Sequence, residues 1–254
     1  MDKASFDQLV NSVLGDTTPR VWSLLVTIFG DLAIANDARL SGATVNALTA
    51  AIGIKPEATR VAIHRLRKEG WIESHRSGRE TRYGLTQSGR TETLAVRARV
   101  YAYDAPNTMP QLVIDKTGVS ASADPTRSVH IGPHMWVQVP PVVSEVAWAL
   151  PVTAELPRWV RDSLCSQDAQ HASQRLADSF ARLLKTGALK GLSPLQEVAL
   201  RVLLVHEWRR LVLRIPEFPD ACFPDAWRGS ECRTALRELM SRLPAPDPAR
   251  LDQI

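Results

Sequence analysis

Cysteines are few in this chain, and none of them is paired by spacing. Cys165, Cys222 and Cys232 are odd in number and form no C-x-x-C motif. This pattern argues against a disulfide framework and a zinc site, and it is typical of proteins in a reducing cytoplasm. The longest apolar stretch, residues 21–29, is too short to span a bilayer, and residues 1–16 lack the apolar core of a signal peptide. The sequence therefore predicts a cytoplasmic protein without a membrane segment.

Enzyme motifs are also missing. The chain contains no G-x-S-x-G elbow, no P-loop and no G-x-G-x-x-G fingerprint. His206-Glu207 begins like the H-E-x-x-H zinc motif, but Arg210 occupies the position of the second histidine. Asp104, Asp115 and Asp124 are scattered among loop-like segments, so we expect them to be solvated rather than to bind a metal. We predict no enzyme activity, no metal and no cofactor.

The chain does have a concentrated positive charge between residues 55 and 82. This stretch holds eight Lys or Arg residues against four Glu, a net charge of +4, which is also the net charge of the whole chain. The remainder is therefore electrically balanced. A local basic surface on a balanced protein is typical of duplex DNA-binding proteins, although a solvated helix with a charged face gives the same pattern.

Residues 56–69 have the pattern of a DNA-recognition helix. Proline suits the first helical position at Pro56, and Gly70 suits the left-handed residue just past the helix end. At helical spacing, one face is predicted to pack or border the core: Ala58, Val61, Ala62, Arg65, Leu66 and Glu69. The opposite face is predicted to be exposed, with Thr59, Arg60, Ile63, His64 and Arg67.

The segments around this helix predict a winged helix-turn-helix. Thr44 is expected to cap a short helix that ends at Ile52, and Gly53 begins the tight turn into the recognition helix. Two extended runs follow, Trp71–Arg76 and Arg79–Leu85, joined through Ser77-Gly78 as a β-hairpin.

Three further helices are predicted around this motif. Residues 1–17 read as an amphipathic arm that packs on the body or on a partner subunit. Thr18-Pro19 is expected to open an apolar core helix, and Thr86 to cap a closing helix over Ser88–Tyr101.

Four segments together resemble one family. They are RVWSLLVTIFGDL (20–32), RLRKEGWI (65–72), SGRETRYGLT (77–86) and VHEWRRLVLRIPEFP (205–219). In this order they resemble the PaaX-like repressors, a family named for the regulator of phenylacetic acid (phenylacetate) degradation. The resemblance implies an α+β, mainly helical protein with a winged helix-turn-helix, a small ferredoxin-like α/β middle domain and a helical C-terminal domain. It also implies a homodimeric transcription repressor released by an aryl-acyl-CoA effector.

We accordingly predict three consecutive domains, 1–103, 104–165 and 166–254. In the middle one, Val, Ile and Trp content favours strands at Gln111–Asp115, His130–Pro140 and Glu145–Val152. In the last, helices are expected over Ala169–Thr186, from Ser193-Pro194 to about Arg214, and over Gly229–Leu243.

The predicted DNA contacts divide into three groups. Arg60 and His64 are expected to reach base edges, with Thr59 close by. Phosphates are expected to contact Lys55, Arg65 and Arg67. On the hairpin, the expected contacts to the adjacent backbone or minor groove are Arg76, Arg79 and Arg82.

A second group of basic residues lies near the C-terminus. His206, Arg209, Arg210 and Arg214 either line a site for an anionic effector or make structural ion pairs around a helix core. Two alternative functions also remain open at this point. One is a metal-dependent nuclease that uses the middle domain, and the other is a winged-helix adaptor that binds proteins.

Overall fold

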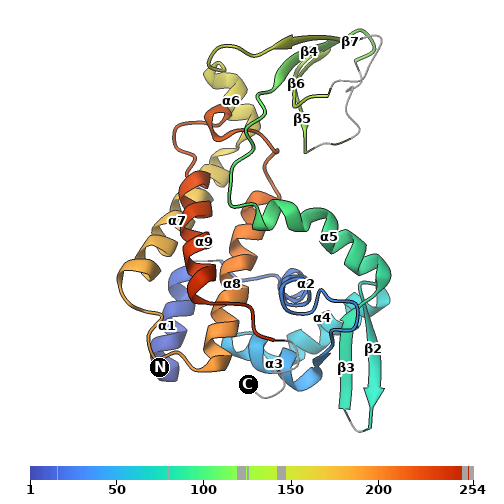
Figure 1. Ribbon diagram of the computed structural model, residues 1–254, viewed down its shortest axis with the longest axis vertical. Helices are drawn as coiled ribbons and strands as arrows, with labels where there is room; N and C mark the ends of the chain where they lie inside the picture. Colours follow the sequence, from blue (N-terminus) through green and yellow to red (C-terminus); the bar gives the residue numbers. More distant parts are fainter. Residues whose placement is uncertain are drawn as a thin grey trace. The chain divides into compact units, whose positions relative to one another are not determined.

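The computed structural model spans the chain and describes residues 1–15, 17–78, 80–118, 124, 126–141, 147–247 and 251. The protein is α+β and mainly helical, with two small antiparallel sheets, as predicted (Figure 1). It divides into two compact units. The first contains Met1–Tyr101, Asp178–Arg209 and Ala235–Ile254, and the second contains Ala102–Ala177 and Arg210–Thr234. The three consecutive domains stay a prediction.

The N-terminal arm forms α1 (Lys3–Leu14), and its apolar face packs within the first unit. Phe6, Val10, Val13 and Leu14 are buried, as the sequence predicts. Ser179 donates a hydrogen bond from its hydroxyl to the Ser12 carbonyl at 3.1 Å, which fixes α1 to α7 (Gln167–Lys185). Of the two predicted roles for the arm, packing on its own chain is the one observed.

Helix starts were predicted less well than helices. The core helix α2 runs over Val21–Leu32, and its N-cap is Arg20, so the start predicted at Thr18-Pro19 was wrong. Ser41, rather than Thr44, caps α3 (Gly42–Ala51), because its hydroxyl accepts from the Thr44 backbone N–H at 2.9 Å. Thr86 does cap α5 (Gln87–Tyr101), with Gly89 N–H donating to its hydroxyl at 3.0 Å.

The small sheet of the first unit contains the predicted hairpin. Strands β2 (Ile72–Ser77) and β3 (Glu80–Leu85) pair antiparallel, from Ile72 opposite Leu85 to Ser77 opposite Glu80. Gly78 lies in the turn with φ +61°, a conformation that suits glycine, so the turn falls one residue later than predicted. A two-residue strand, β1 (Leu40–Ser41), pairs with β3 on its other side. It was missed because two residues carry no periodic pattern.

A buried polar network joins three helices of the first unit. Asp31 on α2 has a fully buried side chain and accepts two hydrogen bonds from Arg201 on α8 (Pro194–Val212), at 2.7 and 2.8 Å. Tyr101 on α5 donates its hydroxyl proton to the same carboxylate, and Arg201 also donates to the Leu243 carbonyl at 2.7 Å. Leu243 directly follows α9 (Gly229–Arg242), so one ion pair holds residues from four parts of the chain.

The second unit contains a four-stranded antiparallel sheet. Its strands are β4 (Gln111–Asp115), β5 (Ser128–Gly132), β6 (Met135–Gln138) and β7 (Ala147–Pro151), in the order β5-β6-β4-β7. The single strand predicted at 130–140 is instead two strands. They reverse around His134, whose φ is +59°, after the turn-favouring Gly132-Pro133 pair. The start of the strand predicted at 145–152 lies outside the described residues.

Two further features complete the second unit. The short helix α6 (Arg158–Leu164) was not predicted. Asp104 and Asp124 are exposed as expected, but Asp115 is buried, so that prediction was wrong. The Asp115 carboxylate accepts hydrogen bonds from the hydroxyl and from the backbone N–H of Thr117, the second at 2.7 Å. These bonds, and the one from the hydroxyl most, lower the pKa of Asp115.

The described part of the chain has neither a membrane-spanning helix nor a cluster of metal-binding side chains. None of its helices is long and apolar enough to cross a membrane. Its His, Cys, Asp and Glu side chains do not gather in groups of three or more that could hold a metal ion.

We expect Asp31→Ala to lower the free energy of unfolding by about 3–5 kcal/mol, because it leaves the Arg201 guanidinium buried without its counter-charge. Urea denaturation followed by tryptophan fluorescence measures the loss. The control is Glu73→Ala, which removes surface contacts with Arg39 at 3.3 Å and with His75 at 3.0 Å and should cost about 0.2–1 kcal/mol. Equal losses for the two variants would contradict the importance of the buried pair.

Candidate nucleic-acid interface

Helix α4 (Pro56–Lys68) turns its packed face to α2 and α3 and leaves the rest in solvent. Pro56 is at its first position, and Gly70 follows its end with φ +73°, as predicted. The buried residues are Thr59, Ala62, Ile63 and Leu66. This packed stripe differs by about one residue from the predicted one: Val61 is 69% exposed and Ile63 is buried, so both predictions were wrong.

Thr59 does not face solvent. It is 0% exposed, and its hydroxyl donates to the hydroxyl of Thr49 on α3 at 2.9 Å. A side chain used in this way ties the two helices together and is not available to a DNA base. We therefore remove Thr59 from the predicted contacts.

The exposed face of α4 is basic. Arg60, His64 and Arg67 are exposed as predicted, together with Lys55 just before the helix and Lys68 at its end. In the part of the chain that the structure describes, Lys55, Arg60, Arg67 and Lys68 make no ion pair with a carboxylate, whereas other arginines of this region do. Their charges are thus available to an external anion.

Arg65 interacts with two side chains of its own chain, Glu69 and Trp22. Its Nε lies 2.7 Å from Glu69, and its guanidinium lies 5.8 Å from the ring centroid of Trp22. Trp22 donates from its indole nitrogen to Glu69 at 2.8 Å and meets Trp71 edge to face. Hydrogen bonds from Arg65, and secondarily from Trp22, lower the pKa of Glu69. This cluster favours a positioning role for Arg65 at the end of α4.

A hollow of about 560 Å³ lies between the last turns of α4 and the start of the hairpin. His64, Arg67 and Lys68 line it from the helix, and Ser74 and Glu73 line it from β2. The Glu73 carboxylate is paired with Arg39 at 3.3 Å. Basic side chains around an open hollow of this kind can hold a phosphate group of a nucleic-acid backbone.

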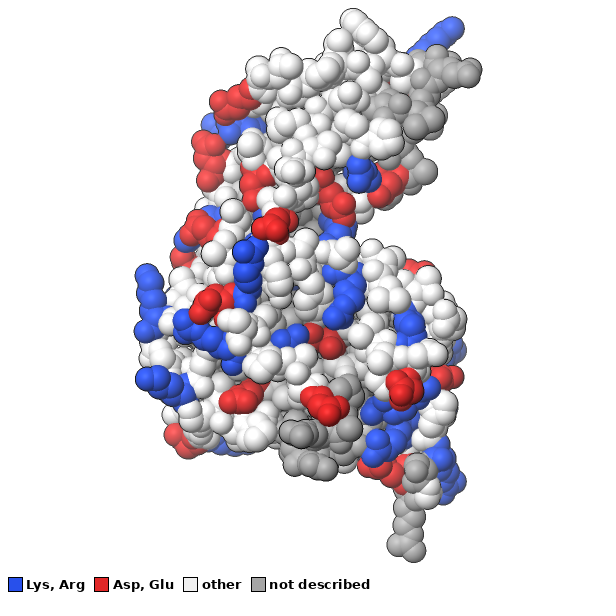
Figure 2. All heavy atoms as spheres, in the orientation of Figure 1, with Lys and Arg blue, Asp and Glu red and all other residues white. Residues whose placement is uncertain are grey.

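The hairpin arginines lie on different faces. Successive strand residues alternate, so Arg76 shares a face with Ser74, which lines the hollow. Arg82 lies opposite His75 on the other face and pairs with Glu80 at 3.1 Å. Arg79 lies outside the described residues. Figure 2 shows Asp and Glu side chains among the Lys and Arg at the hairpin end, so the surface is mixed rather than uniformly positive.

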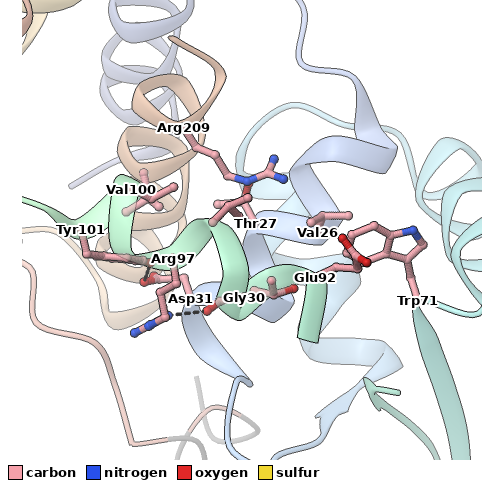
Figure 3. A pocket seen from close by; sticks show the side chains of 13 residues that line it. Val26, Thr27, Gly30, Asp31, Trp71, Glu92, Arg97, Val100, Tyr101 and Arg209 are labelled. Carbon is pink, nitrogen blue, oxygen red and sulfur yellow. Dashed lines mark hydrogen bonds between the residues drawn. The ribbon is translucent and has the colours of Figure 1, made fainter. Parts of the chain in front are cut away.

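The predicted effector residues are only partly brought together. His206 is fully buried, with its Nδ1 3.1 Å from the Thr27 hydroxyl, and Arg209 lines a cavity together with Thr27 (Figure 3). Arg210 and Arg214 belong to the second unit and are not among the residues that line this cavity. The ligand-binding role of these residues stays a prediction.

Comparison with known proteins places the chain in a family. Residues 20–89 match the model described as PaaX-like protein, and residues 166–250 match the PaaX-like protein C-terminal domain. The chain belongs to the PaaX-like family. It is similar to the protein "Transcriptional repressor PaaX" of Escherichia coli (strain K12), with 22% identity over 253 residues that cover 87% of this chain and 79% of the relative. The resemblance predicted from four segments is thus confirmed.

Two features of this PaaX-like chain were not predicted from its sequence. Exposed Val61 was assigned to the core because β-branched apolar residues usually pack, while the buried neighbour Thr59 is polar. The helix phase set by Ala62 and Leu66 is the signal that could have shown this. The cavity beside Arg209 combines residues of α2, α5 and α8, and no local pattern reports such an arrangement.

We expect Thr59→Val to lower the free energy of unfolding by about 0.5–1.5 kcal/mol through the lost hydrogen bond to Thr49. The relative affinities for different duplex sequences should not change. Chemical denaturation and a competition binding assay measure the two quantities. A changed base preference with unaltered stability would restore Thr59 as a DNA contact.

Proposed function

We propose that this PaaX-like protein is a sequence-specific DNA-binding transcriptional repressor, and that α3, α4 and the β2–β3 hairpin form its winged helix-turn-helix. The observation that supports this proposal most strongly is the exposed basic face of α4, where Arg60, Arg67 and Lys68 have no carboxylate partner within the described residues. A helix of this kind, preceded by a short helix and a tight turn, fits the major groove of B-DNA.

Three neighbouring side chains of α4 are proposed to read base edges. Arg60 and His64 are exposed one turn apart, and Val61 lies beside them with 69% of its surface in solvent. An arginine fork suits the two acceptors of guanine, and an apolar side chain suits the methyl group of thymine. Val61 replaces Thr59 in this proposal.

Phosphate contacts are proposed on both sides of the recognition helix. Lys55 precedes α4, Arg67 lines the hollow beside β2, and Arg76 extends the same face of the hairpin. Contacts of this type fix the register of a protein on the duplex without reading its sequence. Arg65 and Arg82 are expected to contribute less, because each has a carboxylate partner at 2.7 and 3.1 Å respectively.

The genes that this regulator controls and its effector are proposed from the family resemblance. The E. coli relative carries the name transcriptional repressor, and the family resemblance supports control of aromatic-acid catabolic genes with an aryl-acyl-CoA as the releasing effector. We also propose a homodimer, because two half-sites about one helical turn apart raise specificity. Such a regulator works in the cytoplasm, where the chromosome is.

We propose that the sheet of the second unit is a reduced ferredoxin-like domain. Its order β7-β4-β6-β5, numbered along the domain, is 4-1-3-2 with all neighbours antiparallel, the order of that fold. The fold normally has a helix in each of two crossovers. In the described parts of the corresponding segments, 116–127 and 139–146, the chain forms no helix.

Arg60→Ala should weaken binding to a selected duplex by about 1–3 kcal/mol and relax the preference at one base position, as expected for a lost paired hydrogen bond to guanine. Competition between duplexes that differ at single positions measures this. The matched control is Lys55→Ala, which should weaken all sequences alike. If Arg60→Ala also weakened all sequences alike, Arg60 would be a phosphate contact.

Arg76→Ala should weaken all duplexes alike and reduce the slope of log affinity against log salt concentration by about 0.9, the value for one lost phosphate contact. Anisotropy titrations at several salt concentrations measure the slope. Arg82→Ala is the control from the opposite hairpin face, where the Glu80 pair predicts a smaller change. A larger effect of Arg82→Ala would reverse the orientation proposed for the hairpin.

A further inference from the structure

The first unit contains a cavity of about 120 Å³ between α2, α5 and α8. Much of its wall is apolar, from Val26, Val96, Val100, Val205 and the ring of Trp71. Val96 and Trp71 are half-exposed and Glu92 is exposed, which gives the cavity a side that solvent can reach. A cavity with an apolar wall and a few polar groups is the usual form of a small-molecule site.

Arg209 is one of the two arginines that line this cavity, and the other is Arg97. The Arg209 side chain extends from α8 toward Thr27 and Val26 of α2 (Figure 3). Its one hydrogen bond within the described residues is a long one, 3.4 Å, to the Ser23 hydroxyl, and no carboxylate there pairs with it. Arg209 is half-buried, and this burial lowers the pKa of its guanidinium. A guanidinium removed from water without a counter-charge is unfavourable and favours an anionic ligand.

The other charged side chains around the cavity have partners or face solvent. Asp31 is neutralised by Arg201 at 2.7 Å. Arg97 donates to the Gly30 carbonyl at 2.8 Å and stacks at 4.4 Å on the ring of Tyr101. Glu92 is an exposed carboxylate at the lining and would repel a second negative charge on a ligand. Arg97 keeps its positive charge, but its guanidinium is already held by a carbonyl and a ring, so a ligand carboxylate fits best at Arg209.

We propose that this cavity binds a small monocarboxylate that carries a single apolar ring, with the carboxylate on the Arg209 guanidinium and the ring among the valines. An apolar protein cavity of about 150 Å³ is known to hold benzene. This cavity of about 120 Å³ is smaller but open to solvent on one side, so it has room for no more than one ring, with the charged group of the ligand at the opening. A coenzyme A thioester is far larger than this cavity, so the ligand proposed here differs from the proposed aryl-acyl-CoA effector, although Arg209 was predicted to take part in binding that effector too.

The position of Trp71 connects this cavity to the proposed DNA-binding elements. Trp71 lines the cavity, its backbone N–H donates to the Leu66 carbonyl of α4 at 2.9 Å, and its carbonyl accepts from Thr86 at 3.0 Å. It thus holds the end of α4 to the start of β2 and α5. We expect a ligand ring bound against Trp71 to shift the hairpin relative to α4 and thereby to weaken DNA binding. This regulatory part rests on the proposed function.

Isothermal titration calorimetry of the full chain with benzoate tests the site. Benzamide, which is neutral and has the same shape, and acetate, which lacks the ring, should each bind at least tenfold more weakly. Arg209→Met removes the charge and Val96→Phe fills the space, and each should weaken benzoate binding at least tenfold. Arg158→Gln, an arginine change on α6 of the second unit, is the matched control and should leave binding unchanged.

Equal binding of benzoate and benzamide to the unmodified protein would overturn the proposal without reference to any variant. Benzoate binding that Arg209→Met leaves unchanged would also overturn it. DNA affinity is measured in parallel, with and without saturating benzoate, and a decrease of threefold or more supports the coupling. Specific DNA binding without benzoate binding would sink this inference alone, whereas benzoate binding without DNA binding would sink the proposed function and leave the site.

Discussion

The buried ion pair between Asp31 and Arg201 is the constraint on which the first unit depends. Two charges removed from water are tolerated only when each is fully paired, and here Tyr101 and the Leu243 carbonyl complete the pairing. Asp31 lies in the first family-model match and Arg201 in the second, so residues far apart in sequence are held in one compact unit. The pair and the Tyr101 hydroxyl therefore join helices α2, α5 and α8 at one point of the core.

This scaffold also sets the recognition helix. Trp22, near the start of α2, donates to Glu69 just past the end of α4, and the Thr59–Thr49 hydrogen bond holds the other end of α4 to α3. Helix α4 is thus fixed at both ends by side chains that do not face the proposed DNA surface. The basic residues between these anchors remain exposed, and fixed helix geometry of this kind is what base readout by side chains requires.

Sequence alone predicted the elements of this surface better than their details. Pro56 and Gly70 bounded α4 correctly, because a ring-fixed φ and a left-handed residue act locally. The packed face was misplaced, because burial of Thr59 depends on Thr49 in another helix. The cavity at Arg209 depends on three helices, so no window of sequence contains it. Local signals are readable from sequence, while contacts between distant segments required the structure.

We propose that this PaaX-like protein recognises specific duplex DNA through α4 and the hairpin. The most direct measurement is selection of genomic DNA fragments by the purified protein at a low and a high salt concentration. Specific recognition predicts enrichment of one palindromic site that persists at the higher salt concentration, while bulk binding falls steeply. Binding that disappears at high salt without any enriched site would contradict the claim, and no binding at low salt would favour a protein-binding adaptor.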